Sequence, residues 1–163
     1  MIDGLKDWTN LLSDHPCSNI FQSPQIFEVY QRTKNYEPVF ITTVDKTNNL
    51  LGLLVAVVQK EHSGLFGMFS ARSIIFGGPL IKDSNPEVLD ILLRKYNKQI
   101  ATKVVYSQFR NLWEWSENMQ KVFVENGFHY ESHLDIINDL KLGKENLWRK
   151  LKPQARQKIK KAI

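Results

Sequence analysis

The chain has 163 residues, of which 42% are hydrophobic and 24% charged, a balance that fits one soluble domain with a single core. Seven of its 22 Lys and Arg lie between Arg149 and Lys161 and no acid follows Trp148, so the net charge of +5 belongs to this C-terminal segment. The preceding residues carry 15 basic against 17 acidic side chains. This near-neutral body disfavours a nucleic-acid-binding domain, because such domains spread positive charge over a face.

Signals for export or membrane insertion are not expected. Residues 1–8 include acids and lack an apolar stretch, unlike a secretory signal. The longest apolar run, residues 50–58, is less than half of the ~20 residues that span a bilayer, so we predict no transmembrane segment. Cys17 is the one cysteine, which excludes an internal disulfide. We expect a cytoplasmic protein.

The first elements are predicted to be helical. Apolar residues at helical spacing predict a helix over residues 3–13, and residues 19–21 are expected to form a short edge strand. Ser23 and Pro24 are typical of a helix N-cap and first helical position, so a second helix is predicted over about 24–35.

Three strands should follow. Residues 39–44 and 50–59 flank a turn cluster and predict a hairpin, whose second strand is apolar on both faces and therefore central. Residues 73–76 predict another strand that runs into a turn at Gly77 and Gly78.

The remaining elements alternate helix and strand. Either Ser84, three residues before Glu87, or Asn85, followed by proline, is expected to cap the next helix. Its predicted buried stripe is Val88, Leu89, Leu92, Leu93 and Tyr96. We then expect a strand over 103–109, a helix over about 116–126 and an extended pair or long bent strand over 128–140.

This order of elements resembles the fold of the GNAT acyl-CoA N-acyltransferases. The expected fold class is α/β (α+β), with a mixed, mostly antiparallel sheet flanked by helices. In GNAT proteins the sheet splays at the fourth strand and the acyl donor enters that cleft. A doubly wound nucleotide-binding fold would instead alternate strand and helix from the start.

Short motifs resemble the Fem family (FemAB-like) of aminoacyltransferases, which build peptidoglycan cross-bridges. They are Ile20-Phe21-Gln22-Ser23-Pro24, Tyr36-Glu37-Pro38, Phe76-Gly77-Gly78-Pro79, Phe109-Arg110-Asn111, Gly127-Phe128-x-Tyr130 and Leu147-Trp148-x-x-Leu151-x-x-x-x-Arg156-x-x-Ile159-x-Lys161-Ala162. The resemblance implies one GNAT-like domain over residues 1–148. Residues 149–163 would be the basic helical start of a connection to a second, missing GNAT-like domain.

The same resemblance implies a cytoplasmic transferase that acts on an amine of a cell-wall precursor. The acyl donor would be an aminoacyl-tRNA or another activated acyl group, and tRNA could contact the basic segment. Coenzyme A binding in GNAT enzymes uses a Gln/Arg-x-x-Gly-x-Gly/Ala turn that places the pyrophosphate at a helix N-terminus. Residues 77–83 lack that motif, and Asp83 would repel phosphate. We therefore expect no cofactor in this part of the protein.

Four candidate substrate-binding residues lie at strand ends. Gly77 and Gly78 could let the backbone approach a ligand, although glycine pairs at strand ends are often bulge or turn devices. Arg110 could pair a phosphate or carboxylate, or form a structural ion pair, and Asn111 follows it in the presumed cleft.

Three further candidates lie elsewhere in the chain. Lys34 and Tyr36, after the second helix, could hold a precursor, although a lysine there also complements the helix dipole. Arg156 could contact a precursor diphosphate. Fem relatives that bind muropeptide often carry a basic residue where this chain has Tyr30.

Other reactive residues support no site. His129 and His133 have a spacing that suits a helical metal pair, but they fall in a segment predicted to be extended, so no metal is expected. Trp113 and Trp115 could stack on a sugar or base, although core packing is the commoner role. We assemble no catalytic constellation and name no catalytic residue.

Three functions stay open from the sequence. The first is the N-terminal half of an acyl or aminoacyl transferase that contributes to an acceptor cleft. The second is an N-acyltransferase for a sugar in surface-polysaccharide synthesis, favoured by Tyr30. The third is a binding module whose basic tail docks on RNA or an anionic membrane.

Overall fold

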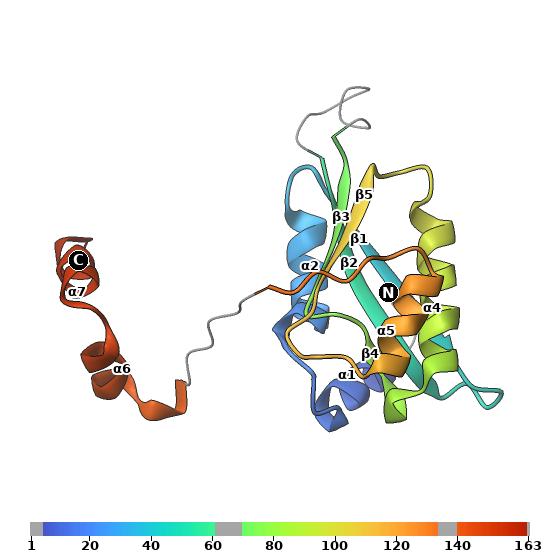
Figure 1. Ribbon diagram of the computed structural model, residues 1–163, viewed down its shortest axis with the longest axis horizontal. Helices are drawn as coiled ribbons and strands as arrows, with labels where there is room; N and C mark the ends of the chain where they lie inside the picture. Colours follow the sequence, from blue (N-terminus) through green and yellow to red (C-terminus); the bar gives the residue numbers. More distant parts are fainter. Residues whose placement is uncertain (1–4, 61–69, 134–139, 163) are drawn as a thin grey trace. The chain divides into compact units, whose positions relative to one another are not determined.

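A computed structural model describes residues 5–60, 70–133 and 140–162. The chain divides into two compact units, residues 1–131 and 132–163, which we call the core unit and the C-terminal unit and describe separately. The core unit is a five-stranded sheet with helices on both faces (Figure 1). None of the helices in the described ranges is long and apolar enough to cross a membrane.

The core unit contains, in chain order, α1 (Leu5–Asp14), the 3-10 turn η1 (Ile20–Gln22), α2 (Pro24–Arg32), β1 (Tyr36–Val44), β2 (Leu50–Gln59), β3 (Arg72–Phe76), β4 (Leu80–Ile81), the 3-10 turn η2 (Lys82–Ser84), α4 (Pro86–Ile100), β5 (Tyr106–Arg110) and α5 (Glu117–Glu125). The C-terminal unit contains η3 (Leu140–Leu142), α6 (Lys144–Lys150) and α7 (Pro153–Ala162).

The sheet is mixed and mostly antiparallel, which confirms the predicted fold class. Its strand order is β1-β2-β3-β5, and β4 also pairs with β2. The pairs β1–β2, β2–β3 and β2–β4 are antiparallel, whereas β3 and β5 are parallel and are connected through α4. The predicted central position of the apolar strand β2 is therefore correct.

Strand β2 is central because it is apolar on both faces. Leu54, Ala56 and Val58 belong to the core cluster under α4 and α5, and the alternating side chains belong to the cluster under α1 and α2. Every one of these side chains is at most 1% exposed. A period-2 strand with apolar residues at every position must be covered on both sides, which fixes the three-layer arrangement.

The predicted caps and turns are largely confirmed. The Ser23 side chain accepts the Ile26 N–H, with Pro24 at the first helical position of α2. Of the two candidates for α4, Asn85 is the cap, and its side chain accepts the Glu87 N–H. The hairpin turn is closed by Asp45, where hydrogen bonds, first from Asn49 and also from Thr47, lower the carboxyl pKa to about 2.

A buried tyrosine joins the parallel strands β3 and β5 to α4. The Tyr96 hydroxyl hydrogen-bonds the Ser73 Oγ at 2.6 Å and the Ser107 Oγ at 2.8 Å. These serines are register partners across the two strands. Burial raises the pKa of the Tyr96 hydroxyl. The side chain therefore acts as a polar cross-link that holds the crossover helix over the parallel pair.

The prediction of an edge strand at residues 19–21 is wrong. Asn19 instead caps the turn η1: its side chain accepts the Phe21 N–H at 3.0 Å, and the Gln22 side chain accepts the Asn19 N–H at 2.9 Å. This reciprocal capping box satisfies the backbone locally, so the apolar residues between its ends do not need a strand partner.

The predicted strand over 128–140 is also wrong for the residues that are described there. Residues 128–133 form no strand, and residues 134–139 lie outside the described residues. Phe128 packs edge-on against Phe109, with ring centroids 4.8 Å apart. Side-chain packing, and not a backbone ladder, therefore holds the start of this segment.

Candidate functional site

The sheet opens where β3 ends. Phe76 and Arg110 are the last register pair of the parallel strands, and the Gly77 N–H donates to the Arg110 carbonyl at 2.9 Å. Beyond this bond, β4 pairs with β2 and with no other described strand, while β5 leads into Asn111 (Figure 1). Here the backbones of residues 77–81 and 111–115 no longer pair as strands, although their side chains and backbone still contact each other at Gly78 and Asn111, and we call this place the splay.

Backbone conformation and two nearby asparagine side chains require glycine at positions 77 and 78. Both residues have positive φ, 75° and 69°, which favours glycine. A Cβ at Gly77 would lie 2.4 Å from the Asn19 Oδ1, and a Cβ at Gly78 would lie 2.4 Å from the Asn111 Oδ1. The groups that approach these two glycines are asparagine amides of the chain itself, and a role of the glycines in binding a ligand stays a prediction.

Gln22 supports the glycine turn from the α1 and α2 side. Its side chain is completely buried, and its Nε2 donates to the Gly77 and Gly78 carbonyls, each at 2.8 Å. Its backbone carbonyl accepts the Trp8 Nε1–H at 2.7 Å. This role of Gln22 was not predicted from the sequence, although the Asn19-x-x-Gln22 spacing of a capping box indicates an ordered turn.

Asn111 places an unpaired acceptor in the splay. Among the described residues, its Oδ1 is buried without a hydrogen-bond partner. The Trp113 ring lies beside the same glycine, 3.4 Å from a Cβ built at Gly78. Because a buried unpaired polar group costs about 1–3 kcal/mol, a ligand that donates a hydrogen bond here would recover part of that cost.

Trp115 supplies an unpaired donor in the loop that follows β5. It is 8% exposed, and its Nε1–H has no partner in the described part of the chain. Its ring lies 5.5 Å from the Trp113 ring at an angle of 61°. The core role of Trp115, which was the alternative to ligand stacking, is confirmed by its place in the cluster under α4 and α5.

Arg110 carries an exposed guanidinium at the edge of the splay. Its Cζ lies 5.2 Å from the centroid of the Phe76 ring, and its Nε–H donates to the Gln108 Oε1 at 3.2 Å. No described carboxylate forms an ion pair with it. The structural ion pair that was the alternative role of Arg110 is therefore not formed within the described residues, and the guanidinium can bind a carboxylate or phosphate.

Lys34 and Tyr36 lie at the other end of the sheet. Tyr36 pairs in register with Gln59, which pairs with Arg72 at the start of β3. β3 ends four residues further along, ~13 Å away at the rise of a strand, and the splay begins only beyond that end. The structure therefore does not bring these two candidates together with the glycine turn, and their binding role stays a prediction.

The charges near Tyr36 form their own network. The Glu37 carboxylate lies 2.6 Å from the Lys103 Nζ and 3.5 Å from the Lys60 Nζ. The hydrogen bond from Lys103 is the main cause that lowers the pKa of Glu37. Glu37 thus forms ion pairs with two lysines of neighbouring segments at a half-exposed position, and its role is structural.

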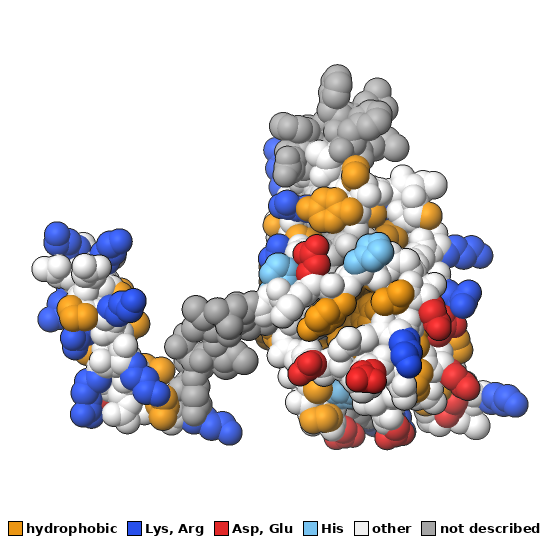
Figure 2. Space-filling view, in the orientation of Figure 1, with side chains coloured by type: hydrophobic (Ala, Val, Ile, Leu, Met, Phe, Trp, Pro, Cys, Tyr) orange, Lys and Arg blue, Asp and Glu red, His pale blue; other side chains and the backbone are white. Residues whose placement is uncertain are grey.

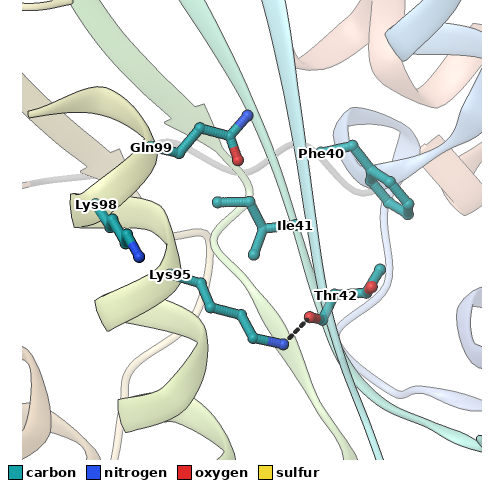
Figure 3. A pocket seen from close by; sticks show the side chains of 6 residues that line it. All are labelled: Phe40, Ile41, Thr42, Lys95, Lys98 and Gln99. Atoms are coloured by element: carbon teal, nitrogen blue, oxygen red, sulfur yellow. Dashed lines mark hydrogen bonds between the residues drawn. The ribbon is translucent and has the colours of Figure 1, made fainter. Parts of the chain in front are cut away.

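An open groove of about 510 Å³ lies at the free edge of β1, away from the splay (Figure 3). It is lined by Phe40, Ile41, Thr42, Lys95, Lys98 and Gln99. The Lys95 Nζ donates to the Thr42 carbonyl at 2.9 Å. This bond occupies an outward-facing backbone group of an edge strand, so the groove is better explained as edge protection than as a binding site.

The N-terminus of α4 does not fit a pyrophosphate. Pro86, at the first helical position, has no N–H, and the next N–H, of Glu87, is already accepted by the Asn85 side chain at 2.9 Å. Asp83 and Glu87 add negative charge at this end. The proline, the occupied N–H of Glu87 and the two acidic residues all disfavour a phosphate group at the N-terminus of α4.

The other candidate groups do not extend the site. The His15 Nδ1 accepts the Cys17 N–H at 3.1 Å, so Nε2 carries the proton and donates to the Ile81 carbonyl, also at 3.1 Å, in a structural role. No group of three possible metal ligands occurs among the described residues, and His129 and His133 are exposed. Arg156 lies in α7 of the C-terminal unit and is half-buried there.

Solved structures of acetyltransferases share this fold. A probable acetyltransferase has 19% sequence identity and a TM-score of 0.55, over 85% of this chain and 95% of its own. A ribosomal-protein-alanine N-acetyltransferase from Brucella melitensis biovar Abortus 2308 has 12% identity and a TM-score of 0.51, over 83% and 94%. An aminoglycoside antibiotic 6'-N-acetyltransferase from Acinetobacter haemolyticus has 14% sequence identity and a TM-score of 0.50, and the match covers 85% of this chain and 94% of that protein.

The chain therefore has the GNAT N-acetyltransferase fold, which confirms the fold that the order of elements predicted. Neither a protein-family model nor a curated protein sequence matches it. At identities of 12–19%, the structural likeness establishes the fold and leaves the substrate to be argued from the site.

Replacing Gln22 tests the support of the glycine turn. Gln22→Leu leaves the Gly77 and Gly78 carbonyls without their buried donor. We expect the free energy of unfolding to fall by about 2–4 kcal/mol, measured by urea denaturation. Gln25→Leu, on the exposed side of α2, is the control and should change it by less than ~0.5 kcal/mol. Equal effects of both variants would contradict the assigned role.

Replacing Gly78 tests the close approach of Asn111. Gly78→Ala should lower the free energy of unfolding by more than Gly127→Ala, because Gly127 has a similar positive φ, 88°, but open space around it. The difference between the two losses of unfolding free energy, about 1 kcal/mol or more, measures the steric overlap of the added Cβ with the Asn111 amide. Adding Asn111→Ala to Gly78→Ala should remove this difference. If Gly78→Ala costs no more than the control, the proposed packing is incorrect.

Proposed function

We propose that this chain is the N-terminal, GNAT-like half of an acyl or aminoacyl transferase, and that its splay forms part of the cleft for an acceptor amine. The observation that carries the proposal is the buried, unpaired Asn111 Oδ1 over Gly78, at the point where the GNAT sheet opens. Arg110 stands at the edge of the same opening.

The proposed chemistry is transfer of an acyl group to nitrogen. The acceptor amine attacks the activated carbonyl, a C–N bond forms, and the bond from carbonyl carbon to the carrier oxygen or sulfur breaks. The proton lost by the nitrogen goes to the departing carrier. In this scheme the Asn111 Oδ1 accepts an N–H of the acceptor and so orients it. Arg110 pairs with an acidic group of the acceptor, such as a carboxylate or a diphosphate.

The donor is proposed to bind outside the core unit. Support comes from the N-terminus of α4, where Pro86 lacks an N–H and the Asn85 side chain already accepts the Glu87 N–H. The resemblance to Fem proteins suggests an aminoacyl-tRNA or another activated acyl group, and a second GNAT-like domain to bind it. The same resemblance suggests a cell-wall precursor as acceptor, Arg156 as a contact to its diphosphate, and a cytoplasmic location.

The names of the structural neighbours are consistent with this reaction type. Two of them are N-acetyltransferases, of ribosomal-protein alanine and of the 6' position of aminoglycosides. Transfer of an acyl group to an amine is the feature that we carry over from these names, and the cell-wall acceptor is supported by the sequence motifs alone.

The proposal predicts the kinetics of an Asn111 variant. In the full-length protein, Asn111→Ala should raise the KM for the acceptor about tenfold with little change in stability, because the amide oxygen lacks a partner inside the chain. Asn118→Ala, exposed on α5, is the matched control. An unchanged KM would remove Asn111 from the cleft. Full activity of residues 1–163 alone would refute the proposed division between two halves.

A second candidate function is N-acylation of a sugar in surface-polysaccharide synthesis. It is favoured by Tyr30, which is 7% exposed and lies 6.2 Å from the ring of Tyr36, at the position where a basic residue is common in muropeptide-binding relatives. Ligand-observed NMR with nucleotide sugars and with muropeptide precursors separates the two functions. We expect binding of the muropeptide class, and selective binding of nucleotide sugars would favour the second function instead.

A further inference from the structure

The C-terminal unit concentrates positive charge on two short helices. Nine of the 23 residues from 140 to 162 are Lys or Arg, and Glu145 is the one acid among them. The charged side chains are distributed over both α6 and α7, and Figure 2 shows them around apolar side chains of this unit. Such a density of cations attracts an anionic surface.

Each helix also carries an apolar stripe. Leu147, Trp148 and Leu151 follow one another at spacings of one and three residues and share one face of α6 and its C-cap. All three are only half-buried in this unit. A helix whose only partner is water rarely leaves a tryptophan and two leucines half-exposed among so many charged side chains.

Helix α7 repeats the pattern at its own spacing. Ala155 and Ile159 are four residues apart and lie on one face, and Ile159 is 39% exposed. By helical geometry, Arg156 and Lys158 flank this stripe on either side, whereas Lys160 and Lys161 lie further round. Long basic side chains that flank an apolar stripe can extend to phosphate groups while the stripe enters an apolar layer.

We infer that α6 and α7 form a docking element for an anionic lipid surface. Charge alone would suit RNA equally, because both present phosphates. The apolar stripes decide between them: aliphatic side chains gain free energy on entering the acyl boundary of a membrane, whereas a phosphate backbone offers them no apolar contact. This inference concerns the C-terminal unit and does not depend on the proposed transferase activity.

Vesicle sedimentation with the full chain, residues 1–163, tests the inference. We expect at least tenfold stronger partitioning into vesicles of phosphatidylglycerol and phosphatidylcholine than into phosphatidylcholine alone, with binding that weakens as salt is added. The triple variant Lys158→Gln, Lys160→Gln, Lys161→Gln should lose at least tenfold. Lys6→Gln, Lys46→Gln, Lys121→Gln, three exposed positions of the core unit, is the control and should bind as the wild type does.

A second experiment separates lipid insertion from simple charge attraction. Brominated lipid should quench the fluorescence of the wild type, and Trp148→Phe should lose most of that quenching, because the other three tryptophans belong to the core unit, where Trp8 and Trp115 are buried and Trp113 is half-buried. Absence of vesicle binding overturns the inference, as does binding without quenching of Trp148. Filter binding to tRNA is measured in parallel, and displacement of the chain from vesicles by tRNA at equal phosphate concentration would overturn it in favour of RNA.

Discussion

The geometry of the core unit depends on the amide of Gln22. Its Nε2 holds the carbonyls of Gly77 and Gly78, and its Oε1 closes the capping box with Asn19, so one buried side chain connects the N-terminal turn to the point where β3 ends. A completely buried amide must have its hydrogen-bonding groups satisfied. This requirement fixes the turn at Gly77 and Gly78, and that turn separates β4 from β5.

The sequence allowed the central parts of this fold to be predicted because local chemistry determines them. Strand β2 is apolar from Leu50 to Val58, and the helix caps Ser23 and Asn85 satisfy neighbouring N–H groups. The strand expected at residues 19–21 failed because a reciprocal cap satisfied that backbone first. The strand expected from Phe128 failed because a ring contact holds the chain there instead.

The candidate site was predictable in part, for a similar reason. Gly77, Gly78, Arg110 and Asn111 stand at the ends of two strands, and parallel pairing with matched register brings those ends together. Lys34 precedes β1 and Tyr36 begins it, and the position of β1 relative to β3 depends on long-range pairing, which no local pattern encodes. The fold thus explains why the two groups of candidates are separate.

The free edge of β1 limits how this sheet can grow. Pro38 and Thr42 have the same parity along the strand, and the carbonyl of Thr42 is taken by Lys95 from α4. At the outward positions of β1, a proline therefore removes one backbone donor and a lysine occupies one backbone acceptor. Fewer groups of this edge are left to hydrogen-bond an added strand. A continuous sheet across β1 would require Lys95 to move aside, whereas β5 at the other edge of the sheet has no such lysine bond among the described residues.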